Sequence, residues 1–437
     1  MIPFKRMLRF KSTFFILVLT CCACGNGSEK SGPEPKIALA ERDSLVPKPV
    51  VVAANRTGEY LPLLQGKKVG VVANQTSVIF KGMDSENKEK MAKEDKRRMM
   101  ENGLQSEYTH LVDSLLSLNV DVIKVFAPEH GFRGEADAGE KVKDGTDTAT
   151  GLPLISLYGK NRKPSAEQLE DLDMVLFDIQ DVGVRFYTYL STLHLVMEAC
   201  AENNIPIVVL DRPNPNAHYV DGPTMEAAHT GFLGMTEIPL VYGMTIGEYA
   251  KMINGEGWLK GKRKADLRVI PLDNWSYGTE YHLPIRPSPN LPDDTSITLY
   301  PSLGLFEGTN VNAGRGTEFQ FQRYGASFLD STQYSFTYTP MPNFGSKSPK
   351  QEGLKCFGKD LSEMPRLQEV SLQWLIDAYT NAVDDSKVFN TEGFTKHAGT
   401  EQLQHQIEAG QTEEEIKETW QADLEDFKKI RAKYLVY

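Results

Sequence analysis

Five short apolar runs, separated by longer stretches of mixed character, set the strongest limit on how this chain can fold. The runs occupy residues 69–73, 120–126, 154–157, 174–179 and 207–210. The segments between them are long enough for helices, for example at 108–118, 166–171 and 192–203. Buried strands that alternate with helices are typical of βαβ units. The pattern therefore predicts an α/β fold, in which a parallel sheet is covered by helices on both faces.

This alternation ends near residue 240. Beyond it come a proline-rich loop, PIRPSPNLPDD at 284–294, and a glycine-rich loop, EGTNVNAGRGT at 307–317. A final helix is predicted from the capping box of Thr412 and Glu415, and its apolar face would consist of Ile416, Trp420, Leu424 and Phe427. We expect a parallel-sheet domain over residues 51–240 and a smaller α+β domain over residues 241–437.

The N-terminus has the pattern of a bacterial export signal. A basic segment is followed by an apolar run at 14–19, which is too short to span a bilayer, and by the sequence TCCAC. The pattern predicts a signal peptide over 1–23, lipidation of Cys24, with Cys22 as the second candidate, and a flexible tether over 24–50. The protein would be exported and lipid-anchored at the periplasmic or cell-surface side of a bacterial membrane. Export without a lipid is the alternative.

Composition excludes several classes of function. Removing residues 1–23 takes away four of the 48 basic residues and none of the 59 acidic ones, which leaves a net charge near −15. Nucleic acid is therefore not an expected partner. The body of the chain holds Cys200 and Cys356, enough for one disulfide, and no Cys-x-x-Cys or His/Cys cluster that suggests a metal. Phosphate-binding glycine motifs are also absent, so no cofactor is expected. Residues 81–107 form a charged stretch that we interpret as a solvated insertion.

Polar side chains follow each of the five predicted strands. Ligands of open parallel sheets bind beyond the carboxyl ends of the strands. The candidate residues there are Asn74 and Gln75; Glu129, His130 and Arg133; Tyr158; Asp178, Gln180, Asp181, Arg185 and Tyr187; and Asp211, Arg212 and Asn214. The two loops of the second half add Arg286, Asn290, Glu307, Asn310 and Arg315. Any one group could serve a turn or a cap, but five groups at one sheet edge predict a ligand site.

The residue types narrow the ligand. Carboxylates and amides bind hydroxyl groups, aromatic faces pack on sugar rings, and arginines pair with a carboxylate of the ligand. A carbohydrate with an acidic substituent fits this mixture better than a neutral one. Glu129 is the candidate for an acid that protonates a leaving oxygen, and a helix cap is its alternative role. His130 could instead be a structural hydrogen-bonding group, and Asp211 could form a buried ion pair with Arg212.

These residues lie in strings that resemble the NamZ-type exo-β-N-acetylmuramidases. The strings follow in order from about residue 60 to the end, and they include VGVVANQTSV, VFAPEHGFRGE, DMVLFDIQDVGVRFYTYLSTL, VVLDRPNPN and YPSLGLFEGTNVNAGRGT. The resemblance implies a Rossmann-like catalytic domain, a smaller C-terminal domain and an active-site cleft between them. It also implies release of N-acetylmuramic acid from the non-reducing ends of peptidoglycan fragments, with Glu129 of the PEHG motif as the catalytic acid.

Glycosidic cleavage needs a second group besides the acid, because its transition state resembles an oxocarbenium ion. Asp178, Asp181, Glu307 or the N-acetyl group of the substrate could supply it, while His130 or Arg133 would set the environment of Glu129. Two other functions are alternatives: a lipid-anchored binding protein for sugars that contain muramic acid, and a metal-dependent esterase or deacetylase. Turnover of a chromogenic muramic acid glycoside, with and without a chelator, distinguishes them. No protein partner is expected.

Overall fold

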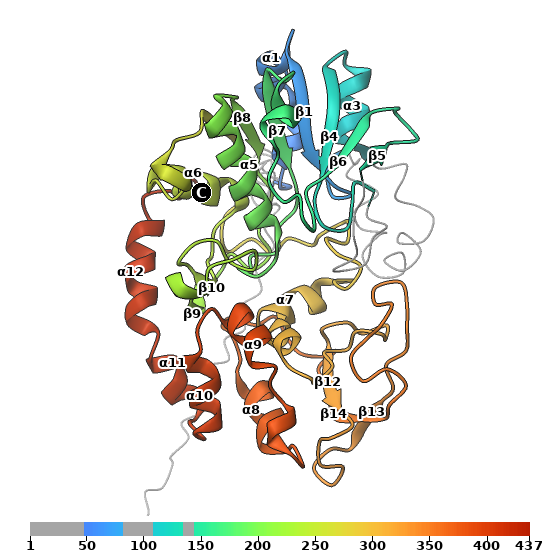
Figure 1. Ribbon diagram of the computed structural model, residues 1–437, viewed down its shortest axis with the longest axis vertical. Helices are drawn as coiled ribbons and strands as arrows, with labels where there is room; N and C mark the ends of the chain where they lie inside the picture. Colours follow the sequence, from blue (N-terminus) through green and yellow to red (C-terminus); the bar gives the residue numbers. More distant parts are fainter. Residues whose placement is uncertain (1–47, 82–107, 134–143) are drawn as a thin grey trace, which may run out of the picture. The chain divides into compact units, whose positions relative to one another are not determined.

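The predicted parallel sheet is present and has seven strands in the order β11-β8-β7-β1-β4-β6-β5. Figure 1 labels the strands from β8 to β5. Neighbouring strands run parallel, except that β5 pairs antiparallel with β6 at one edge. The strands are β1 (Lys68–Ala73), β4 (Asp121–Ala127), β5 (Gly145–Thr146), β6 (Pro153–Ser156), β7 (Met174–Asp178), β8 (Ile207–Leu210) and β11 (Leu267–Ile270). The five apolar runs thus correspond to β1, β4, β6, β7 and β8, with small shifts at their ends.

The computed structural model describes residues 48–81, 108–133 and 144–437, and Pro49–Tyr437 form one compact unit. The predicted signal peptide, Cys24, nearly all of the tether and residues 82–107 of the charged insertion lie outside the described residues. In the described part, no helix combines the length and the apolar character that a membrane span requires. Cys200 and Cys356 are both buried, and they do not form a disulfide with each other.

Both faces of the sheet are buried. Successive side chains of a strand point to opposite faces, so neighbouring residues of one strand belong to different cores. On β7, Phe177 belongs to one apolar core and its neighbour Leu176 to another. The core of Phe177 includes side chains of α4 (Ala166–Leu169), α5 (Tyr189–Asn203) and α6 (Ile246–Gly255). The core of Leu176 includes side chains of α1 (Thr57–Leu64) and α3 (Leu111–Ser117). The prediction of helices on both faces is therefore confirmed.

Two segments differ from the predicted elements. The segment predicted as a helix over 108–118 begins as a strand, β3 (Tyr108–His110), which pairs with β2 (Val78–Phe80). The helix α3 starts only after His110, whose Nδ1 accepts a hydrogen bond from the main-chain N–H of Val112 at 3.2 Å. In addition, the sheet takes its edge strand β11 from beyond the boundary predicted at residue 240.

The smaller C-terminal part contains a three-stranded antiparallel sheet in the order β12-β14-β13 (Figure 1). Its strands are β12 (Arg323–Ala326), β13 (Phe336–Tyr338) and β14 (Cys356–Asp360). Its helices are α7 (Asp294–Leu303), α8 (Gln373–Thr380), α9 (Thr391–Ala398), α10 (Gln402–Glu408), α11 (Glu413–Glu418) and α12 (Gln421–Arg431). A hairpin of β9 (Asp221–Thr224) and β10 (Pro239–Val241) precedes them. The short 3-10 helices are Ala53–Asn55, Ala227–His229, Lys260–Lys262, Gly304–Gly308 and Asp385–Lys387.

The helix predicted at the C-terminus is divided into α11 and α12. The capping box of Thr412 and Glu415 is present at the start of α11. The chain then leaves helical geometry at Trp420, whose φ of −105° and ψ of 1° lie outside the α region. At this break the indole N–H of Trp420 donates a buried hydrogen bond to Asp221 at 3.1 Å. The predicted apolar residues are nevertheless all buried.

Candidate active site

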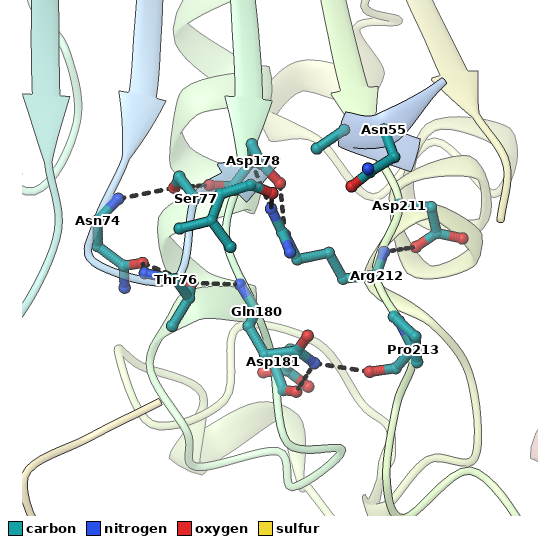
Figure 2. Close-up of polar contacts among 12 residues, drawn as sticks. Asn55, Asn74, Thr76, Ser77, Asp178, Gln180, Asp181, Asp211, Arg212 and Pro213 are labelled. Carbon is teal, nitrogen blue, oxygen red and sulfur yellow. Dashed lines mark hydrogen bonds and ion pairs between the residues drawn. The ribbon is translucent and has the colours of Figure 1, made fainter. Parts of the chain in front are cut away.

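A buried ion pair joins the ends of β7 and β8. Arg212 donates to the two carboxylate oxygens of Asp178 at 2.6 and 2.8 Å, and to the carbonyl of Val78 at 3.0 Å (Figure 2). The two side chains are at most 3% exposed. Burial would lower the pKa of Arg212, but the charge of Asp178 and its hydrogen bonds outweigh this effect and raise the pKa. The pair joins the two strand ends, and the side chain of Asp178 is fully buried.

Amide side chains continue this network (Figure 2). Asn74, just after β1, donates to the hydroxyl of Tyr189 at 2.9 Å. Gln180 donates to the carbonyl of Pro213 at 2.6 Å, and Asn214 donates to a main-chain carbonyl at 2.7 Å. All three amides are at most 4% exposed. They therefore bind the loops to one another and are not available to a ligand.

Asp181 and Asp211 are buried acids with protein partners. Asp211 accepts hydrogen bonds from the hydroxyls of Thr245 and Tyr437, each at 2.7 Å. Asp181 accepts one from the hydroxyl of Tyr242. Burial raises the pKa of each carboxyl to about 6, although these hydrogen bonds act in the opposite direction. The guanidinium of Arg212 thus pairs with Asp178 and not with Asp211, which was one alternative, and neither Asp181 nor Asp211 lines the pocket described below.

Arg185 is a buried guanidinium that binds main-chain carbonyls. It donates to Pro223 and Ile238 of the hairpin region at 2.7 and 2.9 Å. It also donates to His397 and Ala398 at the end of α9, at 3.0 and 2.6 Å. Burial lowers the pKa of Arg185 to about 9. The side chain connects two regions far apart in sequence and is 1% exposed, so it does not reach a ligand.

A pocket of about 570 Å³ opens between the loops of the parallel sheet and the C-terminal part. This volume falls within the usual range for small-molecule sites. The residues that line it are distributed along the chain between Glu129 and His397, so segments far apart in sequence form its wall. The predicted residues that line it are Glu129, His130, Tyr158, Tyr187, Asn290, Glu307 and Arg315.

The other predicted residues do not line this pocket. Arg133 forms ion pairs with Asp113 at 3.4 Å and Asp147 at 2.9 Å. Asn310 is exposed and donates to a main-chain carbonyl at 2.8 Å, while Gln75 donates to the carbonyl of Arg286 at 3.2 Å. The full set outside the pocket is Asn74, Gln75, Arg133, Asp178, Gln180, Asp181, Arg185, Asp211, Arg212, Asn214, Arg286 and Asn310.

Glu129 lies in the pocket wall directly beyond β4, and its carboxylate is held in place by two hydroxyl groups. Thr188 donates to its Oε2 at 2.7 Å. The hydroxyl of Tyr158 hydrogen-bonds to the same side chain, and burial, together with the negative charge of Glu129, raises the pKa of Tyr158. Glu129 remains partly accessible to solvent. It is therefore an oriented carboxyl group that a ligand can reach.

The backbone after Glu129 turns sharply. His130 has a φ of +70°, and Gly131 follows with a φ of +77°. A side-chain-bearing residue seldom adopts this left-handed conformation, which is concentrated at functional sites. The N–H of Gly131 donates to the carbonyl of Pro128 at 3.0 Å and closes the turn. Glu129 and His130 therefore occupy the two central positions of a turn that follows β4 directly.

Glu307 is the second carboxylate of the pocket. Arg315 donates to its Oε2 at 3.0 Å, and the ammonium group of Lys350 donates to its main-chain carbonyl at 2.8 Å. Burial would raise the pKa of Glu307, but the positive charges of Arg315 and Lys350 outweigh burial and lower it. Tyr300 lies close enough to both pocket carboxylates for each to raise the pKa of its hydroxyl, after the larger effect of burial. Glu307 is thus kept in its charged form.

An aromatic wall extends from Glu129 toward the rim. The ring of Tyr158 lies 6.3 Å from the ring of Phe232, measured between centroids. The guanidinium carbon of Arg162 lies 4.2 Å from the centroid of Phe232. This wall therefore presents flat apolar faces next to charged and hydroxyl groups, which suits a sugar ring.

Several wall residues were not singled out from the sequence. They are Arg162, Phe186, Thr188, His229, Thr230, Gly231, Phe232, Leu233, Leu291, Tyr300, Phe321, Lys396 and His397. Thr188 and Tyr300 belong to two segments that resemble the NamZ-type family, YTYLSTL and YPSLGLFEG. That resemblance could have indicated a role for them. No pattern in the sequence marks Arg162 or Phe232, which come from loops without periodicity. Among the described residues, no group of three or more His, Cys, Asp and Glu side chains could hold a metal ion.

The fold and the pocket together define a class of protein. A pocket with two carboxylates among aromatic and hydroxyl side chains is the arrangement that most glycoside hydrolases use. Comparison with known proteins identifies the family. The family models for the N-terminal and C-terminal parts of the exo-β-N-acetylmuramidase NamZ match residues 99–295 and 298–437. The chain belongs to this family and is an enzyme of the glycoside hydrolase class.

Individual relatives agree with this assignment. The chain is 33% identical to the peptidoglycan β-N-acetylmuramidase NamZ of Bacillus subtilis, over 97% of each protein. It is also similar to two crystal structures of DUF1343 family proteins from Bacteroides fragilis. The first has 39% identity and a TM-score of 0.76, and the second 26% identity and a TM-score of 0.67. In both cases 89% of this chain and 99% of the other chain are covered. The two-part fold is thus shared with solved structures.

Proposed function

We propose that the enzyme is an exo-acting glycosidase that releases N-acetylmuramic acid from the non-reducing ends of peptidoglycan fragments. One observation of the structure carries this proposal. Glu129, oriented by Thr188 and Tyr158, lines the same pocket as the charged carboxylate of Glu307. The name of the Bacillus subtilis relative supports the choice of sugar. A volume of about 570 Å³ is of the size that holds one or two sugar rings rather than a long glycan strand.

In the proposed mechanism Glu129 is the general acid. In its protonated form it gives its proton to the glycosidic oxygen as the bond from that oxygen to C1 breaks. The hydrogen bond from Thr188 fixes one carboxylate oxygen, Oε2, and therefore the direction of the other. A water molecule then supplies the hydroxyl group that ends on C1, and its second proton goes to a carboxylate. The products are free N-acetylmuramic acid and the shortened fragment.

Glu307 is the best candidate for the second protein group. Of the acids predicted for this role, Asp178 and Asp181 are buried and do not line the pocket, whereas Glu307 lines it. Positive charge develops at C1 in the transition state, so a carboxylate that stays ionised stabilises it. Arg315 and Lys350 keep Glu307 ionised. We therefore assign to Glu307 the stabilisation of the oxocarbenium-like transition state.

Hydrolysis of 4-nitrophenyl β-N-acetylmuramide tests this function directly. We expect release of nitrophenol at a rate at least about 10²-fold above that for the matching N-acetylglucosaminide, because a site built for a polar group rejects the analogue that lacks it. A chelator should leave the rate unchanged. Binding of N-acetylmuramic acid without turnover would instead identify a binding protein, and inhibition by the chelator would favour the metal-dependent alternative.

We also propose that the mature enzyme is a lipoprotein, exported and anchored through Cys24. The basic segment, the short apolar run and the cysteine at the predicted cleavage site support this location. Wild-type protein should sediment with membranes after cell lysis, and a Cys24→Ala variant should move to the soluble fraction. Recovery of the wild-type protein in the soluble fraction would contradict the proposal.

A further inference from the structure

We propose that Arg162 binds the carboxylate of the lactyl group of N-acetylmuramic acid and so sets the preference of the pocket for this sugar. The inference rests on the proposed function, and it names a residue that decides which sugar is accepted. Muramic acid differs from glucosamine by a lactyl ether at O3, which carries the only carboxylate of the sugar. An enzyme that selects muramic acid therefore needs a cation for that group, placed within one sugar ring of the catalytic acid.

The cations of the pocket leave one candidate. In the described part of the chain, the arginine and lysine side chains that line the pocket are Arg162, Arg315 and Lys396. Arg315 is 3.0 Å from a carboxylate oxygen of Glu307, and Lys396 is 2.6 Å from one of Glu392. Among the described residues, no carboxylate lies within ion-pair distance, 4.0 Å, of Arg162. Arg162 is therefore the pocket cation that a carboxylate on the ligand can pair with without displacing a carboxylate of the protein.

The position of Arg162 fits this role. Its guanidinium stacks on Phe232, 4.2 Å from the ring centroid, and Phe232 in turn neighbours Tyr158 at 6.3 Å. Tyr158 hydrogen-bonds to Glu129, so Arg162 lies on the same wall as the acid, separated from it by the side chains of Tyr158 and Phe232. Stacking holds the guanidinium plane by its face and leaves the N–H groups at its edge available. Those groups have the spacing for a two-point contact with a carboxylate.

Arg162 is also accessible. Its side chain lines the pocket and is exposed, while the side chains of Glu129 and Glu307 are only partly exposed. A sugar held with its glycosidic oxygen at Glu129 could therefore place a substituent of its ring against Phe232 and Arg162. The aromatic ring would contact the methyl group of the lactyl ether, and the guanidinium its carboxylate.

An Arg162→Met variant tests the inference against a pair of substrates. One is 4-nitrophenyl β-N-acetylmuramide, and the other is its lactyl methylamide, which has nearly the same shape without the charge. We expect the wild-type enzyme to prefer the acid by about 10- to 100-fold in kcat/KM, the size of a charge-assisted contact. Arg162→Met should bring the ratio close to one, mainly through KM. Arg162→Lys, which keeps the charge without the planar fork, should give an intermediate ratio.

Lys355→Met is the matched control. The ammonium nitrogen of Lys355 lies 5.3 Å from the ring centroid of Phe357, directly before β14, but Lys355 does not line the pocket. The ratio of kcat/KM between the acid and the methylamide should therefore not change. A preference for the acid that persists in Arg162→Met would overturn the inference while the proposed function stands. Absence of any hydrolysis by the wild type would overturn the proposed function instead. In that case, calorimetry measures the dissociation constants of N-acetylmuramic acid and its methylamide. The ratio of these constants in the wild type and in Arg162→Met then decides the role of Arg162.

Discussion

Replacing Glu129 by Gln is expected to lower kcat for a muramic acid disaccharide by about 10³-fold or more, close to the upper range for general acid catalysis. The leaving group of this substrate is a sugar alkoxide, which needs a proton to depart. Gln keeps the size of the side chain and can still meet Thr188, but it has no acidic proton to give. KM should change little, because the variant removes a contact made in the transition state. The measurement is the release of N-acetylmuramic acid under steady-state conditions.

The leaving group supplies the control for this prediction. The 2,4-dinitrophenolate of a 2,4-dinitrophenyl glycoside leaves without being protonated. Glu129→Gln should therefore lower the rate of cleavage of this substrate far less than that of the disaccharide. Glu425→Gln changes an exposed acid on α12 in the same way and should leave both rates unchanged. An equal loss on the two substrates would show that Glu129 does not act as the acid.

Replacing Arg212 by Met is expected to lower the free energy of unfolding by about 3–5 kcal/mol, because it leaves a buried carboxylate without its partner. Asp178 has 0% exposure and receives two hydrogen bonds from this guanidinium. Once Arg212 is gone, water cannot replace these bonds without opening the sheet edge. Denaturant-induced unfolding, followed by far-UV circular dichroism, measures the change.

A double variant separates the charge effect from lost packing. Asp178→Leu with Arg212→Met removes both charges, so it should be clearly more stable than Arg212→Met alone. Lys429→Met breaks an ion pair in which both side chains are about three-quarters exposed, 74% and 77%, so it should leave the free energy of unfolding without measurable change. A double variant that is no more stable than the single one would mean that the cost lies in packing rather than in an unpaired charge.

The parallel sheet could be predicted because its strands are buried on both faces. A strand such as β7, with the sequence MVLFD, then becomes a continuous apolar run that stands out from the helical segments. The edge strand β11 has the sequence LRVI and is only partly buried, so the same signal was too weak to reveal it. The segment at Tyr108–His110 pairs with a distant strand, which no local pattern encodes.

The candidate site was predicted less completely than the fold. The motif PEHG was informative because a carboxylate, a histidine and a glycine in succession at a strand end have few structural uses. Asp178 and Arg212 have the same residue types at the same edge, but their side chains pair with each other. Sequence spacing does not tell whether a polar side chain turns toward a neighbouring loop or toward a cavity. Arg162 and Phe232 stand in loops, where the partner in space decides the role.

The pocket wall has a consequence for how activity appears during folding. Its two carboxylates come from Glu129 and Glu307, and other wall residues reach as far along the chain as His397. Contacts over such long sequence separations form late, because closing large loops costs entropy first. A refolding chain should therefore regain its helices and strands before any catalytic power. Recovery of enzymatic activity would therefore mark the formation of the last tertiary contacts. It is a stricter test of the native state than a spectroscopic signal of secondary structure.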